Sequence, residues 1–341
     1  MKQYLEYKIP EIERSLEKFY DRLKSNELLR DLATSGSINP DTFRRAIYEP
    51  SKEAVVVTGG KRIRPILVYL AHDIVGGSCE YIDDLAILPE LLHKGSVVVD
   101  DIQDGSQRRD NRDPLYKSHG VATALNVGNF LYFVAGLVLD KTEIDAKREL
   151  EIMQNLFHEG LIAHIGQGSD IYWRETQTLP TEQEYLQMNA YKASTFRFAV
   201  GLGAILGNGS KGQKESLVEI AEATGTAYQL KDDLLSLDEN AHDYGDDITE
   251  GKISLMVLRT FQNQSKNAER LRGILFSKTR DPIQIREAID IMRDDGSIEY
   301  TEQKARNLVD EAVQKLFQEF PESAYRRVFS ELIAYGISRE K

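Results

Sequence analysis

The sequence is poor in cysteine, with a single residue of this type, Cys79, among 341. One thiol excludes an internal disulfide framework and a metal site built from several thiolates, so we interpret Cys79 as a small buried apolar side chain. Positive charge is also outnumbered, because the chain has 43 lysines and arginines and 55 aspartates and glutamates. The net charge is −12. Non-specific nucleic-acid binding needs a basic surface, so no nucleic-acid partner is expected.

Long hydrophobic runs are missing as well. The longest run, FLYFVAGLVL at Phe130–Leu139, is shorter than the ~20 residues that span a bilayer. The amino-terminal stretch MKQYLEYKIPEIERSLEKFY lacks the continuous apolar core of a signal peptide. The sequence therefore predicts a soluble, cytoplasmic protein without a transmembrane segment, and it leaves association with a membrane surface open.

Apolar residues instead recur with the helical spacing i, i+3, i+4 and i+7. The segments with this pattern are Ile9–Ala33, Ile63–Val75, Ile82–Ile102, Ala122–Asp140, Lys147–Ile171, Thr181–Leu206, Lys214–Leu237, Lys252–Phe261, Pro282–Arg293 and Tyr300–Phe317. Alternating runs bounded by hairpin signals are absent, so no sheet is expected. Residues 1–341 contain no linker-like or repetitive tract. We therefore predict a single all-α domain, a large helical bundle, with residues 1–35 as an N-terminal helix packed on the core.

Three aspartates end one of the most apolar predicted helices. The stretch LAILPELLHKGSVVVDDIQD places Asp100 and Asp104 four residues apart on one helix face, with Asp101 beside them. Their charges repel one another, and a helix dipole gives no help at its carboxyl end. A hard cation such as Mg²⁺ would replace this repulsion by coordination. A solvated helix end is the alternative interpretation.

A second acidic pair follows another apolar helix. Asp232 and Asp233 end the stretch AYQLKDD, and Gln229 lies one turn earlier on the same face. Two such faces in one bundle are able to converge on shared metal ions. Paired carboxylates also occur in glycoside hydrolases, but adjacent aspartates suit metal chelation better than a single acid and a single base do.

Basic residues complete the pattern. GGKRIRP, at Gly59–Pro65, places Lys61, Arg62 and Arg64 directly after two glycines. The GxxxxGK[ST] spacing of a nucleotide-binding loop is absent, yet glycine N–H groups followed by cations are typical of an anion site. Further candidates are Arg108, Arg109, Lys192 and Lys252. Each alone is typical of a solvated surface, but beside two aspartate clusters they predict a Mg²⁺-assisted site for diphosphates.

The order and approximate spacing of these motifs resemble those of the trans-isoprenyl diphosphate synthase (polyprenyl synthetase) family over nearly the whole chain. The stretches that carry the resemblance are GGKRIRP, ELLHKGSVVVDDIQDGSQRR, GQGSDIYW, AYQLKDD and DDITEGKIS. GQGSDIYWRETQTLPTEQEY and DDGSIEYTEQKA are most similar to geranylgeranyl diphosphate synthases of the eukaryotic type. The resemblance implies the isoprenoid synthase fold with a central catalytic cavity, and a homodimer.

The resemblance further implies a prenyltransferase that joins isopentenyl diphosphate to an allylic diphosphate with three Mg²⁺ ions per active site. The implied metal residues are Asp100 and Asp104 with Asp101 in support, and Asp232, with Asp233 and Gln229 acting from behind it or through water. Arg108, Lys192 and Lys252 would clamp the allylic diphosphate. Gly60, Lys61, Arg64, His93 and Arg109 would hold isopentenyl diphosphate. The implied catalytic residues are Asp100, Asp104, Gln229, Lys192 and Asp170, the last of which would line the cavity and help to stabilise the cation.

Residues before the first acidic cluster bear on product length. Gly95 and Ser96, with Leu92 one turn earlier, would line the wall along which a growing chain descends. Relatives that make a fifteen-carbon product close this wall with aromatic residues, whereas Gly95 leaves space, so the prediction is a product of at least twenty carbons, geranylgeranyl diphosphate. Close helix packing against Gly95 is the alternative.

Two departures from the family pattern leave other functions open. Ser236 stands where many relatives have a third aspartate, and Ala193 follows Lys192 where threonine is usual. These changes are compatible with reduced activity or with a non-catalytic subunit of a heteromeric synthase. A terpene cyclase on the same fold is a further alternative, against which the retained Lys61, Arg64 and His93 argue.

Overall fold

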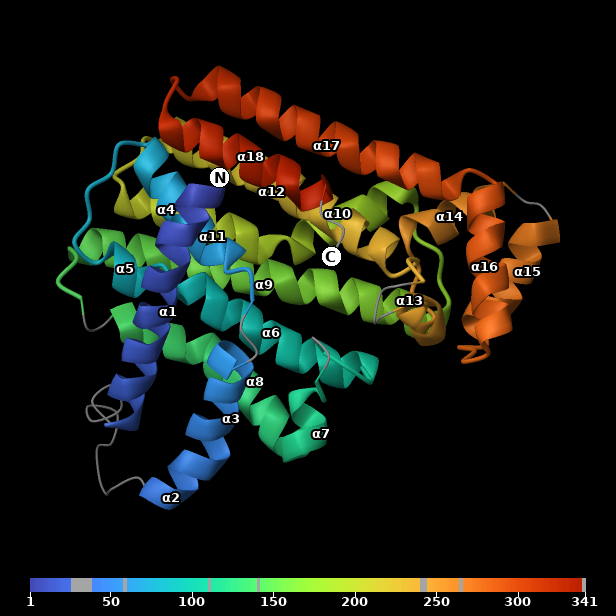
Figure 1. Cartoon of the computed structure of the whole chain (residues 1–341), viewed down its shortest axis with the longest axis horizontal. Coiled ribbons are helices and arrows are strands. Elements are labelled where there is room, and N and C mark those ends of the chain that lie inside the picture. The colour runs from blue at the N-terminus through green and yellow to red at the C-terminus, as the bar shows by residue number, and fades with distance from the viewer. Residues whose placement is uncertain are drawn as a thin grey trace. The chain divides into compact units, whose positions relative to one another are not determined.

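All regular elements in the described part of the chain are helices. The computed structural model describes residues 1–25, 39–57, 60–109, 112–139, 142–239, 244–263 and 266–338. Figure 1 shows helices and no strand arrows, and within these ranges the single strand-like pairing is an isolated bridge between Arg109 and Arg112. The predicted all-α class is confirmed.

The chain divides into two compact units. Unit 1 comprises Met1–Leu156 and Phe198–Lys214, and unit 2 comprises Phe157–Arg197 and Glu215–Lys341. A single domain over residues 1–341 therefore stays a prediction.

Unit 1 contains the helices of the amino-terminal part of the chain. They are α1 (Lys2–Lys24), α2 (Pro40–Phe43), the π-helical η1 (Arg44–Tyr48), α3 (Glu49–Lys52), the π-helical η2 (Glu53–Val57), α4 (Ile63–Ile74), α5 (Ile82–Leu85), α6 (Leu88–Asp104), α7 (Leu115–His119) and α8 (Val121–Leu139). Three helices contribute residues to both units: α9 (Ala146–Thr176), α11 (Ser194–Leu206) and α12 (Lys211–Leu235).

Unit 2 adds the helices of the carboxyl-terminal part. They are α10 (Glu182–Lys192), α13 (Asp246–Glu250), α14 (Leu255–Gln262), α15 (Lys266–Phe276), α16 (Pro282–Asp294), α17 (Ser297–Glu319) and α18 (Ala324–Ser338). Helices α17 and α18 run side by side (Figure 1). Apolar side chains of α14, α15 and α16 form a continuous core in this unit.

The helical predictions are right for most segments and wrong at several ends. The segment Thr181–Leu206 is two helices, because α10 ends at Lys192 and α11 begins at Ser194. Helix α10 begins with a capping box in which Thr181 and Glu184 satisfy each other's backbone N–H groups. Helices α15 and α18 were not predicted, since both bury only a narrow apolar stripe.

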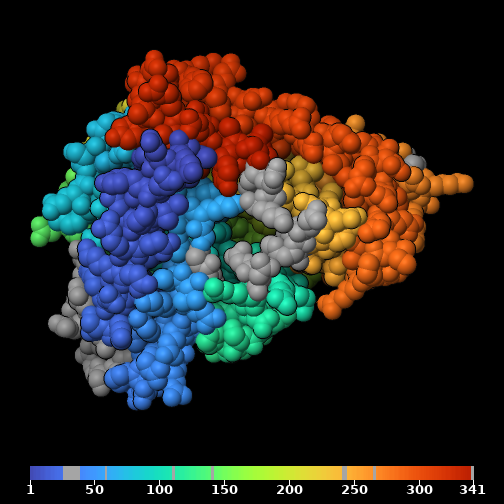
Figure 2. Space-filling model, in the orientation of Figure 1, coloured from blue at the N-terminus to red at the C-terminus, as the bar shows by residue number. Residues whose placement is uncertain are grey.

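Helix α1 packs on unit 1 along one apolar face, and Figure 2 shows it in dark blue on the surface turned to the viewer. Its buried apolar residues are Ile12, Leu16, Phe19, Tyr20 and Leu23. The Tyr20 hydroxyl donates to the Ser51 carbonyl oxygen at 2.8 Å. The predicted N-terminal helix over residues 1–35 thus ends at Lys24, and residues 26–38 lie outside the described ranges.

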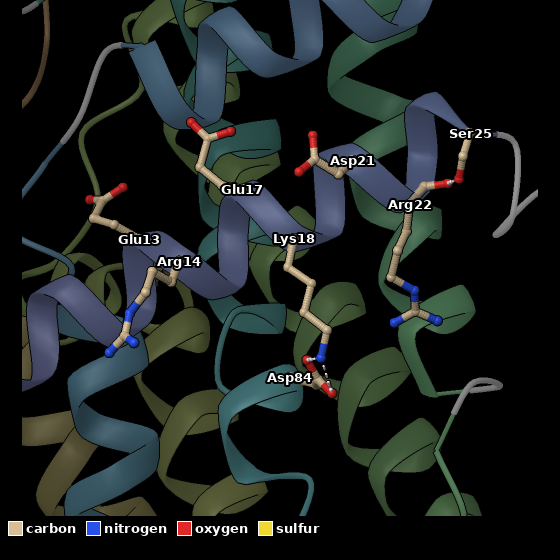
Figure 3. Close-up of a pocket in the computed structure, with 8 residues that line it drawn as sticks. All are labelled: Glu13, Arg14, Glu17, Lys18, Asp21, Arg22, Ser25 and Asp84. Atoms are coloured by element: carbon tan, nitrogen blue, oxygen red, sulfur yellow. Dashed lines mark hydrogen bonds and ion pairs between the residues drawn. The ribbon is translucent and has the colours of Figure 1, made fainter.

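The polar side of α1 carries two rows of opposite charge around a surface pocket (Figure 3). The acidic row is Glu13, Glu17 and Asp21, and the basic row is Arg14, Lys18 and Arg22. Lys18 Nζ donates to Asp84 Oδ1 of α5 at 2.8 Å, and Lys52 Nζ donates to Glu17 Oε2 at 2.6 Å. These charges dock α1 on its neighbours, and none of the predicted site residues lines the pocket.

Helices α6 and α8 approach closely because glycines face each other where they cross. A Cβ atom added to Gly95 would lie 2.8 Å from the Gly128 carbonyl oxygen, and one added to Gly128 would lie 2.7 Å from Val99 Cγ2. A side chain at either position would force the helices apart. This crossing fixes the helix that ends in the first acidic cluster.

Helix α8 is the one described helix with the length and hydropathy of a membrane span. One such helix is weak evidence for a membrane segment, because a core helix has the same composition. The face of α8 that contains Gly128 is packed against α6, and 39% of the apolar stretch is buried.

Arg62 links three helices of unit 1. It is 1% exposed and takes the left-handed conformation, with φ 51°, at the start of α4. Its Nε donates to Glu13 Oε1 of α1, and its Nη1 donates to Glu90 Oε1 of α6, both at 2.7 Å. Arg62 therefore stabilises the packing of α1, α4 and α6. The sequence instead assigns it to the predicted anion site of GGKRIRP.

Replacing Glu90 tests this buried ion pair. In Glu90→Gln the Arg62 guanidinium loses a buried counter-charge, so we expect the free energy of unfolding to fall by about 3 kcal/mol. The matched control is Glu17→Gln, which breaks the more exposed pair with Lys52 and should cost less than about 1 kcal/mol. Urea unfolding of the two variants measures the difference, and equal losses would contradict the assignment.

Candidate active site

The first acidic cluster occupies the last turn of α6. The helix ends at Asp104 because Gly105 adopts the left-handed conformation, with φ 66°, which glycine takes without strain. The N–H groups of Gly105 and Ser106 both donate to the Asp101 carbonyl oxygen. Asp100 and Asp104 are half-buried and share one helix face, as the sequence predicts.

Asp101 is buried and bound to Arg109. Only 2% of Asp101 is exposed, and its Oδ1 accepts from Nε of Arg109 at 2.9 Å and from Nη2 at 2.5 Å. Burial raises the pKa of Asp101 above its ordinary value, and the Arg109 charge opposes that shift. The Arg109 side chain remains 40% exposed, so the ion pair fixes a cation that other groups can still reach.

Several cations gather around His93 on α6. Burial and the nearby charges of Arg64 and Lys94 lower the pKa of His93 well below its ordinary value, and Arg109 adds to the effect. His93 is therefore neutral at neutral pH and able to donate one N–H group to an anion. Gly60 lies beside this group, since a Cβ atom at its position would be 3.7 Å from Lys94 Nζ. Its φ of 140° is a conformation that favours glycine.

The other predicted residues of unit 1 differ in exposure. Lys61 and Arg108 are exposed, and Arg64 and Leu92 are half-buried. Ser96 is also half-buried, and its hydroxyl donates to the His93 carbonyl oxygen at 2.8 Å. The structure thus brings Gly60, Arg64, His93 and Arg109 together.

Gly95 faces α8. Besides the Gly128 carbonyl, a Cβ atom at Gly95 would meet Cε1 of Tyr132 at 3.2 Å. This geometry favours close helix packing, the alternative that the sequence left open. Burial and the Asp100 charge raise the pKa of Tyr132 to about 12, so its hydroxyl stays protonated beside the acidic cluster.

In unit 2, Asp233 of the second acidic pair and Asp247 both contact Lys252. Lys252 Nζ donates to Asp233 Oδ1 at 2.7 Å and to Asp247 Oδ1 at 3.2 Å. The other oxygen of Asp233, Oδ2, accepts from the Tyr185 hydroxyl at 2.5 Å. Although burial opposes it, the charges of Asp233 and Asp247 raise the pKa of Lys252 well above its ordinary value.

Ser236 contacts a carboxylate that the sequence analysis did not single out. The Gly245 N–H donates to the Ser236 carbonyl oxygen at 2.8 Å and brings the start of α13 to the end of α12. The Ser236 hydroxyl then lies 3.0 Å from Asp247 Oδ2 and 2.8 Å from the Asp233 carbonyl oxygen. A carboxylate is therefore present beside residue 236, directly after the end of α12.

Asp247 carries charge that its surroundings do not fully balance. Burial raises the pKa of Asp247 to about 6, with a further contribution from the charge of Asp233, despite the nearby Lys252. One lysine thus serves two carboxylates, that of buried Asp233 and that of half-buried Asp247. Additional positive charge would stabilise this group.

Asp170 and Lys192 form a third pair in unit 2. Lys192 Nζ donates to Asp170 Oδ2 at 2.7 Å. Although burial opposes it, the charges of Lys192 and Lys252 lower the pKa of Asp170, which stays ionised at neutral pH. Gln229 and Asp232 are half-buried on the last two turns of α12. The structure thus joins Asp170 to Lys192 and Asp233 to Lys252, as expected for neighbours in one site.

Ala193 is explained by packing. A Cβ atom added to Gly225 of α12 would lie 2.5 Å from the Ala193 Cβ atom, so the chain after Lys192 lies directly against that helix. The small side chain at residue 193 and the glycine at residue 225 therefore fit each other. Ala193 lacks the hydroxyl of a threonine, and its close contact with α12 holds the end of α10.

The acids suit Mg²⁺ that is bound together with a phosphate group. No cluster of three or more His, Cys, Asp or Glu residues in metal-binding geometry occurs among the described residues. Mg²⁺ usually binds to one or two carboxylates and completes its shell with water and phosphate oxygens. Asp100 and Asp104, four residues apart on one face, offer that set, and the imperfectly balanced charge at Asp247 is compatible with a cation nearby.

Sequence reasoning missed Tyr185, Asp247 and Lys94. Asp247 lies inside the DDITEGKIS stretch, so its position beside Lys252 carried a usable signal. Tyr185 occupies an ordinary buried position of an amphipathic helix, and nothing in its spacing distinguishes it. Lys94 is a buried lysine within an apolar helix, which was a signal for an anion or a carboxylate nearby.

Comparisons with known proteins show which family the chain resembles. The model of the polyprenyl synthetase family matches residues 45–292. A geranylgeranyl pyrophosphate synthase of Aspergillus fumigatus is 33% identical over 74% of this chain and 70% of its own.

Two solved structures share the fold. A geranylgeranyl pyrophosphate synthetase from Pyrococcus horikoshii has a TM-score of 0.81 at 25% identity and covers 97% of this chain and 99% of its own. A geranylgeranyl pyrophosphate synthase from Corynebacterium glutamicum, complexed with isoprenyl diphosphate and magnesium, has a TM-score of 0.84 at 23% identity and covers 99% of both chains.

The raised pKa of Asp247 predicts a specific pH dependence of stability. Between the ordinary value of 3.8 and about 6, the folded state keeps a proton that the unfolded state has lost. This contribution is complete below pH 4 and disappears as pH rises through 6. The free energy of unfolding should therefore fall from pH 4.5 to 7.5 more steeply in the unmodified protein than in Asp247→Asn.

Urea unfolding in a chelating buffer measures both pH profiles. The control is Asp310→Asn, which changes an exposed acid of α17 and should leave the profile unchanged. Parallel profiles for Asp247→Asn and the unmodified protein would contradict the prediction.

Proposed function

This chain belongs to the polyprenyl synthetase family and is a prenyltransferase, and we propose that it makes geranylgeranyl diphosphate from isopentenyl diphosphate and an allylic diphosphate. The observation that carries the proposal is the pairing of buried acids with cations in each unit, Asp101 with Arg109 and Asp233 with Lys252. Oriented cations next to acids that suit Mg²⁺ are what diphosphate groups require. The names of the curated relatives support the twenty-carbon product.

Isopentenyl diphosphate would be held by unit 1. Arg109 and Arg64 supply positive charge beside His93, whose lowered pKa leaves it neutral. Gly60 lets the backbone approach the diphosphate without a side chain, and Lys61 adds a mobile charge at the exposed side. The close grouping of Gly60, Arg64, His93 and Arg109 supports this assignment.

The allylic diphosphate would be held by cations from both motifs and by metal. Asp100, Asp104 and Asp232 are the proposed Mg²⁺ ligands, with three ions per site. Bound Mg²⁺ would supply positive charge that stabilises the departing pyrophosphate. Arg108, Lys192 and Lys252 would bind its oxygens, and Gln229 would act through water.

The reaction needs charge stabilisation and no nucleophilic side chain. When the allylic C–O bond breaks, its electron pair leaves with pyrophosphate, whose oxygens Lys192 and Lys252 would bind. The alkene electrons of isopentenyl diphosphate form the new carbon–carbon bond with the allylic cation. Loss of a proton to pyrophosphate restores the double bond. Asp170, which Lys192 keeps ionised, would place negative charge near the cation.

Product length would be set along α6. Leu92 and Ser96 are half-buried and remain candidates for the wall of the chain cavity. Gly95 would act indirectly, because its lack of a side chain determines how near α8 approaches. A cytoplasmic location is proposed from the family alone.

A homodimer is proposed from one face of α9. Phe157, Leu161 and Ile165 follow one another at four-residue spacing and are 55%, 68% and 57% exposed. The exposed residues from 157 to 172 include no aspartate, glutamate, lysine or arginine. A symmetric dimer places the same patch against itself, which an uncharged apolar face allows without repulsion. The proposed occupant is therefore a second copy of the chain.

Product analysis tests the proposed activity. Purified protein with Mg²⁺, isopentenyl diphosphate and each of dimethylallyl, geranyl and farnesyl diphosphate should yield a twenty-carbon diphosphate. Asp100→Asn should lower turnover by about 100-fold or more, because a proposed metal ligand is lost. The control Asp310→Asn should keep full activity.

Other outcomes distinguish the alternatives. Farnesyl diphosphate as the main product would contradict the proposed length. No elongation of any starter would contradict the transferase proposal for the isolated chain and favour a non-catalytic subunit. Cyclic hydrocarbon products would favour a terpene cyclase.

The dimer face is tested by charge insertion. Leu161→Asp would place two carboxylates in a desolvated apolar contact, so we expect the dimer to dissociate to monomers in sedimentation equilibrium. Ile283→Asp is the matched control, since Ile283 is 77% exposed on α16, away from the α9 stripe in sequence, and the dimer should persist. A monomeric unmodified protein, or a dimeric Leu161→Asp, would contradict the proposal.

A further inference from the structure

The two acidic clusters share an asymmetry between adjacent aspartates. In each Asp–Asp pair the second residue is buried, with Asp101 2% exposed and Asp233 4% exposed. The first residue of each pair, Asp100 or Asp232, is only half-buried. Adjacent residues on a helix point about 100° apart, so one of them can enter the core while its neighbour faces outward. The same division in two unrelated stretches suggests a shared role for the buried member.

Both buried aspartates bind a cation of the proposed diphosphate sites. Asp101 Oδ1 receives two donors of the Arg109 guanidinium. Asp233 receives Lys252 on Oδ1 and the Tyr185 hydroxyl on Oδ2, so both of its oxygens are engaged. Tyr185 is itself buried, which keeps this hydroxyl in place.

Such carboxylates are poorly suited to Mg²⁺. The ion dehydrates reluctantly and keeps several waters, so its protein ligands must lie where a hydrated ion can reach them. The side chains of Asp101 and Asp233 are only 3% and 5% exposed. Direct coordination would also require breaking a charge-assisted hydrogen bond to Arg109 or Lys252.

We propose that Asp101 and Asp233 are positioning residues: they orient Arg109 and Lys252 toward diphosphate oxygens, with Tyr185 holding Asp233, and they are not metal ligands. This inference rests on the proposed function, because it assigns roles within the same site. It divides each Asp–Asp pair into a metal-facing member and a member that orients a phosphate-binding cation. A long, flexible lysine or arginine loses much side-chain freedom on binding, and a buried carboxylate fixes it in advance.

The arginine side is tested without turnover. Isopentenyl diphosphate is titrated into metal-free protein by calorimetry, and Mn²⁺ binding is measured by electron paramagnetic resonance with inorganic pyrophosphate present. Asp101→Asn should weaken the diphosphate by about 10-fold and leave the number of bound Mn²⁺ ions unchanged. Asp100→Asn should lower the number of bound Mn²⁺ ions and leave the affinity for isopentenyl diphosphate unchanged.

A double variant shows whether Asp101 acts through Arg109. Arg109→Gln should weaken isopentenyl diphosphate, and adding Asp101→Asn to it should cause no further loss. The double variant also avoids an unpaired guanidinium, so the comparison survives if Asp101→Asn alone is poorly folded. A full additional 10-fold loss in the double variant would overturn the proposal for this pair.

The lysine side has a closely matched tyrosine control. Tyr185→Phe removes only the hydroxyl that donates to Asp233. Tyr300→Phe removes an analogous hydroxyl that donates to Glu182 Oε1 at 2.8 Å. Inorganic pyrophosphate binding to metal-free protein should weaken several-fold in Tyr185→Phe and about 10-fold in Asp233→Asn, and stay unchanged in Tyr300→Phe.

The two proposals fail in different ways. Reduced Mn²⁺ binding with unchanged pyrophosphate affinity in Asp101→Asn and Asp233→Asn would overturn the positioning roles while leaving the prenyltransferase assignment intact. An unmodified protein that elongates no starter, yet shows the expected pyrophosphate losses, would overturn the proposed product and retain the positioning roles.

Discussion

Buried carboxylates in this protein depend on a cation held at hydrogen-bonding distance. Moving an ionised carboxylate out of water costs roughly several kcal/mol. Only a well-placed opposite charge with hydrogen bonds offsets that cost. Glu90 meets the requirement with Arg62, and this pair ties α6 to α4. Asp101 meets it with Arg109 one turn beyond the end of the same helix. The interaction that permits burial also fixes the direction of the cation. A requirement of the fold thus produces an oriented positive charge at the place where an anion would bind.

In unit 2 the same requirement is met less completely. Asp170 has Lys192, but Asp233 and Asp247 both depend on Lys252. Burial, with a further contribution from the charge of Asp233, raises the pKa of Asp247 to about 6. A diphosphate entering this group would add negative charge to one that already has a surplus. A divalent cation is therefore expected to strengthen binding of the diphosphate, and the acids alone do not form a preorganised three-ligand cluster in the described part of the chain. Metal and diphosphate are thus expected to bind together.

The sequence predicts the helices, the order of the motifs and the residue types of the site, because periodicity and charge spacing are local properties. It does not predict which aspartate of an adjacent pair is buried, since that depends on which face of α6 or α12 other elements cover. Asp247 reaches Ser236 only through the bond from the Gly245 N–H to the Ser236 carbonyl, a contact that no spacing rule contains. The interruption between α10 and α11 at Ala193 was not predicted for a related reason. The helical spacing of apolar residues continues unchanged across it. The meeting of both units' residues in a central cavity stays a prediction.

The departures from the family pattern are therefore better understood with their neighbours than one at a time. Ser236 lacks a carboxylate, but its hydroxyl lies beside the carboxylate of Asp247. Negative charge therefore remains at the end of α12. Ala193 lacks a hydroxyl, but a larger residue would have to share space with α12 where Gly225 allows the close approach. In both cases the changed residue is small and a neighbouring element occupies the space that results. Loss of activity does not follow from such a substitution, because what the chemistry requires is the charge near the diphosphate and the orientation of Lys192 and Lys252, and both are supported by contacts that these substitutions leave in place.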